Sequence, residues 1–381
     1  MDQRLGLDIL SKIMNWSDDR ARREFAWLRL MARLKYDGYQ DFLAGVRFIE
    51  SLATWLQQFA SEERETAYSF VRNELVYVGP VEMQRLVETF YPRTVQNRLL
   101  RCVSARRGIP TYRIWADPTA AREFERLKRA TLFMGLSDGA RIDILRHTNE
   151  RVLTNEQIVV ATQLDAEKWQ DMLKKLRRDL NDPTAKFALV YLVDDFMGSG
   201  TSFLRFDQEK QDWVGKLMRF RDSVLLATRA TSGSTPFEEE EWELCVHHYI
   251  ASHKAAHDIQ NRAADLRGSP GAASWFRSIH FSFGMVLPAS LPISADPRHG
   301  AFIDLTKKYY DPVIQTPHTD VGGVTHLGLG YGGCALPLVL EHNTPNNSVA
   351  LLWAETDGGV REGGVEAPPM RPLFRRRQRY S

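Results

Sequence analysis

The sequence predicts an α/β fold in which a parallel sheet is preceded by an all-helical N-terminal domain. Apolar residues recur at helical spacing through the first part of the chain. Farther along, apolar runs suited to buried strands alternate with helical segments, which is typical of a parallel sheet with crossover helices. We therefore expect a helical domain over residues 1–125, an α/β domain over 126–355 and a flexible basic tail over 356–381.

The helical domain contains one apolar stripe over residues 42–59 and another over 81–90, which Pro92 closes. Such stripes more often form an internal core than a partner surface. A basic and aromatic segment follows. It can contact RNA or phosphate, although a solvated loop is the simpler interpretation. Its members are Arg101, Arg106, Arg107, Tyr112 and Arg113.

The first expected strand, 131–134, leads into the loop Gly-Leu-Ser-Asp-Gly-Ala-Arg at 135–141. A strand, a small-residue loop and a helix together form an arrangement that binds phosphates. Ser137, Asp138 and Gly139 are therefore candidate phosphate ligands, and a purely structural turn is the alternative. A helix is then expected from Asp165, and Asn-Asp-Pro at 181–183 ends it.

Residues 189–202 are the most informative part of the chain, because a buried strand is followed by two acids and a small-residue turn. Asp194 and Asp195 fall at the carboxyl end of the strand, where open α/β sheets bind ligands. We expect a helix to begin after the turn, so that free amides at its N-terminus bind a phosphate. Two carboxylates beside such a cradle indicate a sugar phosphate. The alternative is an ordinary strand end with solvated acids.

This pattern resembles the phosphoribosyl-pyrophosphate (PRPP) loop of type I phosphoribosyltransferases. The resemblance implies a sheet of that kind, in which Asp194 and Asp195 contact the ribose. It also implies that the loop at 137–141 holds pyrophosphate, with Arg141 supplying positive charge. The residues that it assigns to the 5′-phosphate are Met197, Gly198, Ser199, Gly200, Thr201 and Ser202.

One position departs from part of that family. Purine-salvage members carry an Asp, a proposed general base, where this chain has Gly198. The resemblance is therefore nearer to the orotate type. Mg²⁺ is the implied cofactor, and oxygens of the bound PRPP or nucleotide would hold it in place of a protein cage.

A second resemblance adds the polar segment Glu-His-Asn-Thr-Pro-Asn-Asn-Ser at 341–348 to the two loops. The three segments together resemble phosphoribosyltransferase-like proteins of bacterial conflict systems, over residues 120–355. That likeness implies an effector in antiviral defence, acting with a protein or RNA component of the same system. His342, Asn343 and Asn346 are then candidates for a hood or acceptor loop, and a simple turn is the alternative.

Composition narrows the class further. The formal net charge of +2 argues against a general nucleic-acid binder. The three cysteines lack metal or disulfide spacing, so we expect free thiols, no protein-bound metal and a cytoplasmic location. No apolar run is long enough for a membrane span. The basic tail that includes Phe374 and Tyr380 can bind a partner, or have no role.

These features favour an enzyme of the glycosyltransferase (phosphoribosyltransferase-like) class that acts at ribose C1′. Asp194, Asp195 and Arg141 are the expected catalytic residues. Two alternatives stay open: an inactive sensor that binds PRPP or a nucleotide, and a scaffold that binds a protein or RNA partner.

Overall fold

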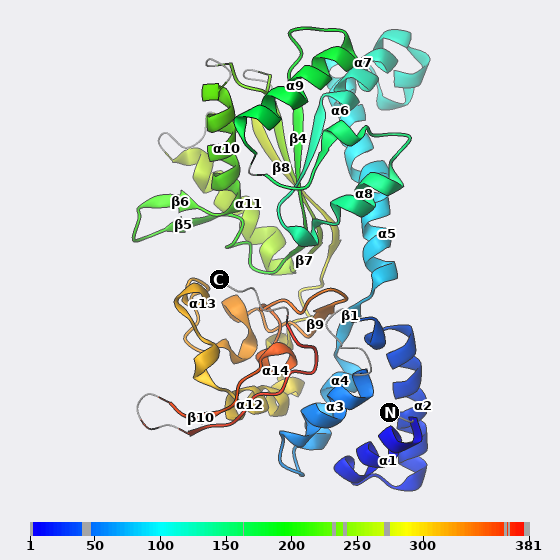
Figure 1. Cartoon of the computed structure of the whole chain (residues 1–381), viewed down its shortest axis with the longest axis vertical. Coiled ribbons are helices and arrows are strands. Elements are labelled where there is room, and N and C mark those ends of the chain that lie inside the picture. The colour runs from blue at the N-terminus through cyan, green and yellow to red at the C-terminus, as the bar shows by residue number, and fades with distance from the viewer. Residues whose placement is uncertain are drawn as a thin grey trace. The chain divides into compact units, whose positions relative to one another are not determined.

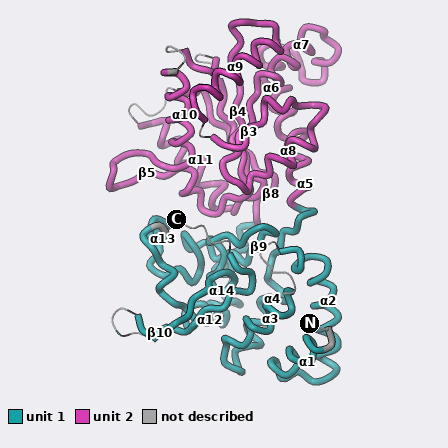
Figure 2. The backbone as a smooth tube through the Cα atoms, viewed as in Figure 1, with its two compact units in different colours: residues 1–82, 288–381 teal, residues 83–287 magenta. Residues whose placement is uncertain are grey.

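The chain forms two compact units, coloured separately in Figure 2. The computed structural model describes residues 3–39, 47–162, 164–230, 234–238, 242–269, 275–361, 364 and 366–376. Unit 1 combines residues 1–82 with 288–381, and unit 2 is the continuous segment 83–287. These boundaries differ from the expected 1–125, 126–355 and 356–381.

Unit 2 is built around a five-stranded sheet in the order β3-β2-β4-β7-β8, in which every neighbouring pair is parallel (Figure 1). The parallel sheet predicted from the sequence is therefore confirmed. Its central strands are apolar runs because both faces are covered, as is usual in parallel sheets. The strands are β2 (Thr131–Gly135), β3 (Ile158–Val159), β4 (Leu189–Met197), β7 (Glu243–Ala251) and β8 (Ser278–Val286).

Helices cover both faces of this sheet, with α5 and α6 on the opposite side from α10 and α11 (Figure 1). The helix expected from Asp165 is confirmed, since the Asp165 carboxylate accepts a hydrogen bond from Lys168 N at 2.7 Å. Asn181 ends that helix in a left-handed conformation. The helices are α5 (Pro80–Phe90), α6 (Gln96–Arg107), α7 (Pro118–Arg129), α8 (Ile142–Thr148), α9 (Ala166–Leu180), α10 (Lys216–Ala230) and α11 (His253–Gly268).

The helix expected directly after residues 198–202 is wrong. A hairpin of β5 (Arg205–Asp207) and β6 (Asp212–Val214) comes first, and α10 begins only at Lys216. A cross-strand aromatic pair stabilises the hairpin. The rings of Phe206 and Trp213 pack edge to face, with their centroids 5.6 Å apart. The hairpin returns the chain to the turn, where Lys216 N donates to Ser202 O at 3.1 Å.

The sequence predicted an all-helical N-terminal domain, but unit 1 contains a strand in its N-terminal part. β1 (Val76–Val78) pairs in parallel with β9 (Leu338–Leu340), so the first 82 residues share one core with the C-terminal segment. The remaining elements are α1 (Gln3–Met14), α2 (Asp18–Leu34), α3 (Phe48–Gln57), α4 (Arg64–Asn73), α12 (Gly300–Lys308), α13 (Pro317–Asp320), α14 (Ala350–Trp353), β10 (Gly359–Val360) and β11 (Glu366–Ala367).

The expectation of a flexible tail over 356–381 is also wrong for its described part. Leu373 and Phe374 are fully buried, and Phe374 stacks on Phe48 with ring centroids 5.6 Å apart. The sequence suggests linker because glycine, proline and charge dominate there, yet a few apolar residues suffice to attach the segment. Residues 377–381 lie outside the described part of the chain, as do residues 40–46 at the start of the expected stripe.

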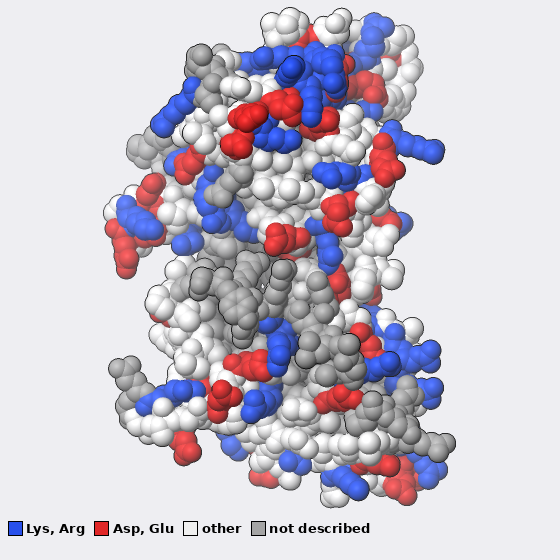
Figure 3. Space-filling view, in the orientation of Figure 1, with Lys and Arg blue, Asp and Glu red and all other residues white. Residues whose placement is uncertain are grey.

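The surface is not dominated by one sign of charge. Basic and acidic side chains are interspersed over the face that Figure 3 shows, in agreement with the formal charge of +2. No helix in the described part of the chain is long and apolar enough to cross a membrane.

Candidate functional site

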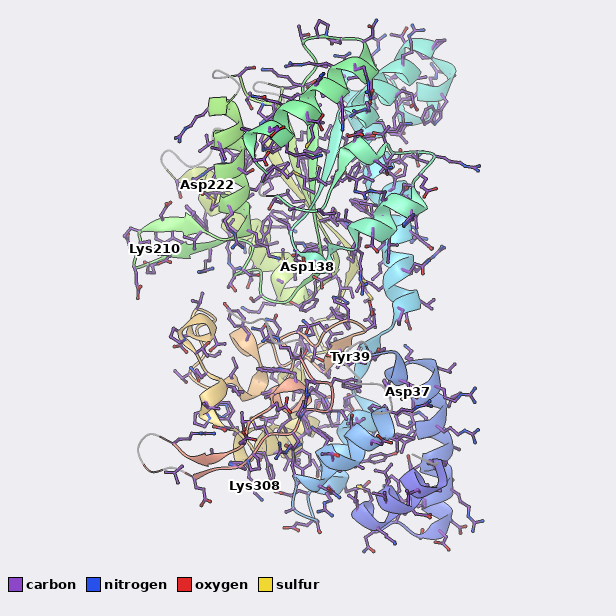
Figure 4. All side chains as sticks on the ribbon, in the orientation of Figure 1. Asp37, Tyr39, Asp138, Lys210, Asp222 and Lys308 are labelled. Atoms are coloured by element: carbon purple, nitrogen blue, oxygen red, sulfur yellow. The ribbon has the colours of Figure 1, made fainter. Side chains whose placement is uncertain are left out.

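The loops that follow β2 and β4 meet at the carboxyl edge of the unit 2 sheet. Leu136 N donates to Val193 O at 2.8 Å, and Ser137 Oγ donates to Asp194 Oδ1. Gly139 lies so close to Asp195 that a Cβ on Gly139 would overlap the carboxylate. Asp138, labelled in Figure 4, is exposed beside these contacts. The structure thus brings together two loops that lie far apart in sequence, since Ser137 and Asp194 are separated by 57 positions.

Asp194 is almost completely buried, at 3% exposure, and both of its oxygens have partners. Oδ1 accepts from Ser137, and Oδ2 forms an ion pair with Lys216 Nζ. Burial raises the pKa of Asp194 above its ordinary value, and the positive charge of Lys216 opposes that shift. Asp194 therefore serves to hold Ser137 and Lys216 in place, rather than to face solvent.

Asp195 lies in a different environment because successive residues of a strand point to opposite faces. It is half-buried, and its Oδ1 accepts from Phe196 N at 2.7 Å. Its Oδ2 lies against Gly139. Asp195 accordingly lies against Gly139, whereas Asp194 contacts Ser137 of the same loop.

The turn 198–202 is held by α11. Ser252, the N-cap of α11, donates through Oγ to Gly198 O at 2.6 Å. Arg262 Nη1 donates to Ser199 O at 2.9 Å, beside Gly200, whose φ of 75° requires the left-handed region. A local contact also lies within the turn, where Ser199 Oγ and Thr201 Oγ1 are 2.9 Å apart.

The backbone amides of this turn are available to a ligand. Within the described residues, the N–H groups of Ser199, Gly200 and Ser202 donate to no protein acceptor, although Ser199 and Gly200 are buried. Buried amides are nearly always paired, so these amides are suited to an acceptor from outside the protein. They lie in an irregular turn, however, and not at the helix N-terminus that the sequence predicted. Met197, just before them, is buried at the end of β4.

Arg141 lies at the same edge of the sheet. It has a φ of 50° and precedes α8, where its carbonyl accepts from Leu145 N at 3.0 Å. The buried phenol of Tyr249 interacts electrostatically with Arg141 and with both acids, and burial is the main cause of its raised pKa. The Tyr249 hydroxyl has no hydrogen-bond partner among the described residues.

Sequence reasoning missed Lys216, Arg262 and Tyr249. Lys216 reaches Asp194 only because the β5–β6 hairpin precedes α10, and nothing in the sequence indicated that return. Arg262 lies in α11, but no spacing rule connects it to residue 199. Tyr249 belongs to β7, where an aromatic residue is ordinarily part of the core.

The candidates for a hood or acceptor loop belong to unit 1; they are His342, Asn343 and Asn346. Their segment is fastened to that unit: Glu341 N donates to Val78 O at 2.9 Å, and Tyr331 N donates to Asn346 O at 2.6 Å. Neither contact involves the loops of unit 2, so a hood or acceptor role for this segment stays a prediction.

The described residues contain no group of three or more His, Cys, Asp or Glu side chains that could hold a metal ion. The oxygen atoms at the edge of the sheet include those of Asp138 and Asp195 and the hydroxyls of the turn. This set resembles the sparse protein contribution that Mg²⁺ usually receives when phosphate oxygens supply its other ligands.

Comparisons with known proteins give one match. A family model described as PRTase-CE matches residues 52–376, which include both loops and most of each unit. No curated protein matches the chain, and no solved structure does.

Proposed function

Because the chain belongs to the PRTase-CE family, a phosphoribosyltransferase-type family, we propose that unit 2 binds PRPP or a nucleotide and acts at ribose C1′. The observation that carries this proposal is the meeting of the two loops through Ser137 and Asp194. Parallel sheets bind ligands at this edge, and here it combines acids, unpaired amides and basic side chains.

Each part of the site has a role in the proposal. The N–H groups of Ser199, Gly200 and Ser202 donate to the 5′-phosphate oxygens, with Thr201 beside them. Asp195 receives hydrogen bonds from ribose hydroxyls, while Asp194 positions Ser137 and Lys216. Lys216 and Arg262 supply positive charge near the phosphate.

The loop after β2 would hold the leaving group. Bond cleavage at C1′ develops positive charge on the sugar and negative charge on the departing pyrophosphate. Ser137 and Gly139 border the acids, and Arg141 follows Gly139 by two residues, so this loop can stabilise that negative charge more in the transition state than in the ground state. Mg²⁺ held by pyrophosphate oxygens, with Asp138 nearby, would neutralise part of it.

A sensor without turnover is the second candidate, and the Lys216–Asp194 ion pair favours it. In the first candidate both acids were expected to contact ribose, yet Asp194 has both oxygens engaged and is buried. A PRPP or nucleotide sensor needs only the phosphate turn and Asp195. In either role, we propose a place in a bacterial defence system, with a protein or RNA partner.

Calorimetry with PRPP and Mg²⁺ tests binding. Asp195→Asn should weaken affinity at least about tenfold, because a charge-assisted hydrogen bond contributes about 1.5–3 kcal/mol. Exposed Asp222→Asn is the matched control and should bind as the wild type does. Unchanged affinity in Asp195→Asn would remove the ribose assignment.

Pyrophosphate release separates the two candidates. An enzyme should release pyrophosphate or free base, and Arg141→Ala should reduce the rate by about 10²–10³ with a smaller effect on affinity. A sensor should bind PRPP without release in any variant. Equal turnover in Arg141→Ala and wild type would place the leaving-group contact elsewhere.

A further inference from the structure

A pocket of about 290 Å³ lies in unit 2 between α6 and the strands β7 and β8. Its wall includes Tyr191 and Cys245, which are register partners on β4 and β7. Tyr191 precedes Asp194 by three residues, or about 10 Å along a strand at about 3.3 Å per residue. The pocket is therefore separate from the loops at the carboxyl edge.

Three arginines line this pocket: Arg93, Arg98 and Arg101. Arg98 is paired, because its Nε and Nη2 donate to Glu243 Oε2 at 3.0 and 2.6 Å. Arg93 and Arg101 form no ion pair with any described residue. The pocket thus has two positive charges that no neighbouring acid offsets.

Nearby arginines of the same helix differ in this respect. Arg106 pairs with Glu238 and Arg107 with Glu123, each at 3.8 Å. The sequence had grouped these residues with Arg101 as one basic segment. The structure separates Arg106 and Arg107, which pair with acids, from Arg101, which lines the pocket.

The opposite wall supplies polar groups without further charge. His280 Nε2 lies 2.6 Å from Arg98 Nη2, and a guanidinium can only donate, so the imidazole accepts and is neutral. Burial, with Arg98 as the second cause, lowers the pKa of His280 and keeps it neutral. Ser282 adds a hydroxyl to this wall, and Asn97 of α6 adds an amide to the lining.

The backbone beside the pocket is irregular. Tyr91–Val95 forms a π-helical turn between α5 and α6. Pro92 lacks the N–H that a regular helix needs, and the wider turn accommodates it. Arg93 and Thr94 lie in this turn and also line the pocket. Such turns occur frequently at functional sites.

We propose that this arginine pocket binds a small phosphate-bearing compound, with the phosphate between Arg93, Arg98 and Arg101. Planar guanidinium groups bind phosphate through paired hydrogen bonds. A bound phosphate would supply the negative charge that Arg93 and Arg101 lack as ion-pair partners. The volume is near the lower end for ligand sites, about 300–1,000 Å³, and suits free phosphate or a sugar phosphate. This site is additional to the one proposed for PRPP.

Calorimetry with inorganic phosphate and with ribose 5-phosphate, at low salt, tests the proposal. Arg93→Gln combined with Arg101→Gln should weaken at least one of these two ligands about tenfold or more. Both side chains are exposed, so the double variant should keep the wild-type unfolding temperature. Arg113→Gln, an exposed arginine outside the pocket, is the control and should bind both ligands normally.

A crystal soaked in tungstate, a phosphate mimic, locates the site directly. Anomalous density is expected between Arg98 and Arg101 in the wild type and should be absent from the double variant. Density only at the turn 198–202, or unchanged affinity for both ligands in the double variant, would overturn the proposal. PRPP binding by the double variant should be unchanged, so failure here is distinguishable from failure of the PRPP site.

Discussion

Two adjacent acids at the end of one strand have separate tasks because a strand alternates its faces. Asp194 turns inward to Lys216 and Ser137, whereas Asp195 borders Gly139. The sequence shows the pair but not the division, since the division depends on what packs against each face. The type of residue was predictable here, and its environment was not.

Asp194→Asn should lower the free energy of unfolding of unit 2 by about 1–3 kcal/mol, because it leaves Lys216 without its charge partner in a buried setting. Adding Lys216→Met should restore part of that loss. Chemical denaturation of both variants gives the values, with Asp222→Asn as the exposed control. A further loss in the double variant would show that the two residues do not act as a pair.

Gly139→Ala should weaken PRPP binding while changing stability little. The new methyl group would displace the Asp195 carboxylate, and the backbone at 139 does not require glycine. Calorimetry together with thermal unfolding separates the two effects. Gly268→Ala adds a methyl group where no atom lies within 4 Å and should leave binding unchanged. Wild-type affinity in Gly139→Ala would mean that Asp195 does not contact the ligand.

At the scale of elements, β2 and the first part of β4 were predictable because each is a continuous apolar run. The helix from Asp165 was predictable because its cap and its Asn-Asp-Pro ending are local signals. The β5–β6 hairpin was not predictable, since its strands have three residues each and weak alternation. That failure also concealed Lys216, whose place depends on the hairpin.

β7 makes unit 2 sensitive to acid. Burial lowers the pKa of both His247 and His248 from 6.5 to about 3. The unfolded chain therefore takes up protons below pH 6.5 that the folded chain excludes. Each histidine contributes stability in full above pH 6.5 and loses it toward pH 3, at about 1.4 kcal/mol per pH unit.

Denaturation between pH 5 and 6 measures this slope. His248→Gln should lower the slope of the unfolding free energy against pH by the contribution of about one proton. The exposed His257→Gln variant should leave that slope unchanged. A slope that is equal in wild type and His248→Gln would mean that the buried histidine is protonated in the folded protein.

At the scale of the whole molecule, the division into units could not be read from the sequence. The link between the two ends of the chain is a short strand pair and a few aromatic contacts, notably Phe374 on Phe48. Neither segment has a pattern that identifies the other as its partner. Composition instead favoured a helical domain and a free tail.

Truncation tests whether the C-terminal segment contributes to the core of unit 1. Removing residues 371–381 should destabilise unit 1 by several kcal/mol, because Leu373 and Phe374 are fully buried and each such side chain contributes about 2–5 kcal/mol. Removing only 377–381 keeps both buried side chains, so the difference between the two truncations isolates their contribution. Thermal unfolding of the two truncated proteins compares them, and equal transitions would show that the buried pair is dispensable. Only the shorter truncation is suitable for testing whether the tail binds a partner.

The pairing of β1 with β9 also has a consequence for synthesis on the ribosome. The first 82 residues leave the exit tunnel without the strand that completes their core. At about 5–20 residues per second, the roughly 200 residues of unit 2 need on the order of 10–40 s to be made. During that delay unit 2 can fold, while the helices within residues 1–82 keep their apolar surface exposed. A nascent chain stalled before residue 338 should therefore recruit chaperones, and one released after residue 376 should not.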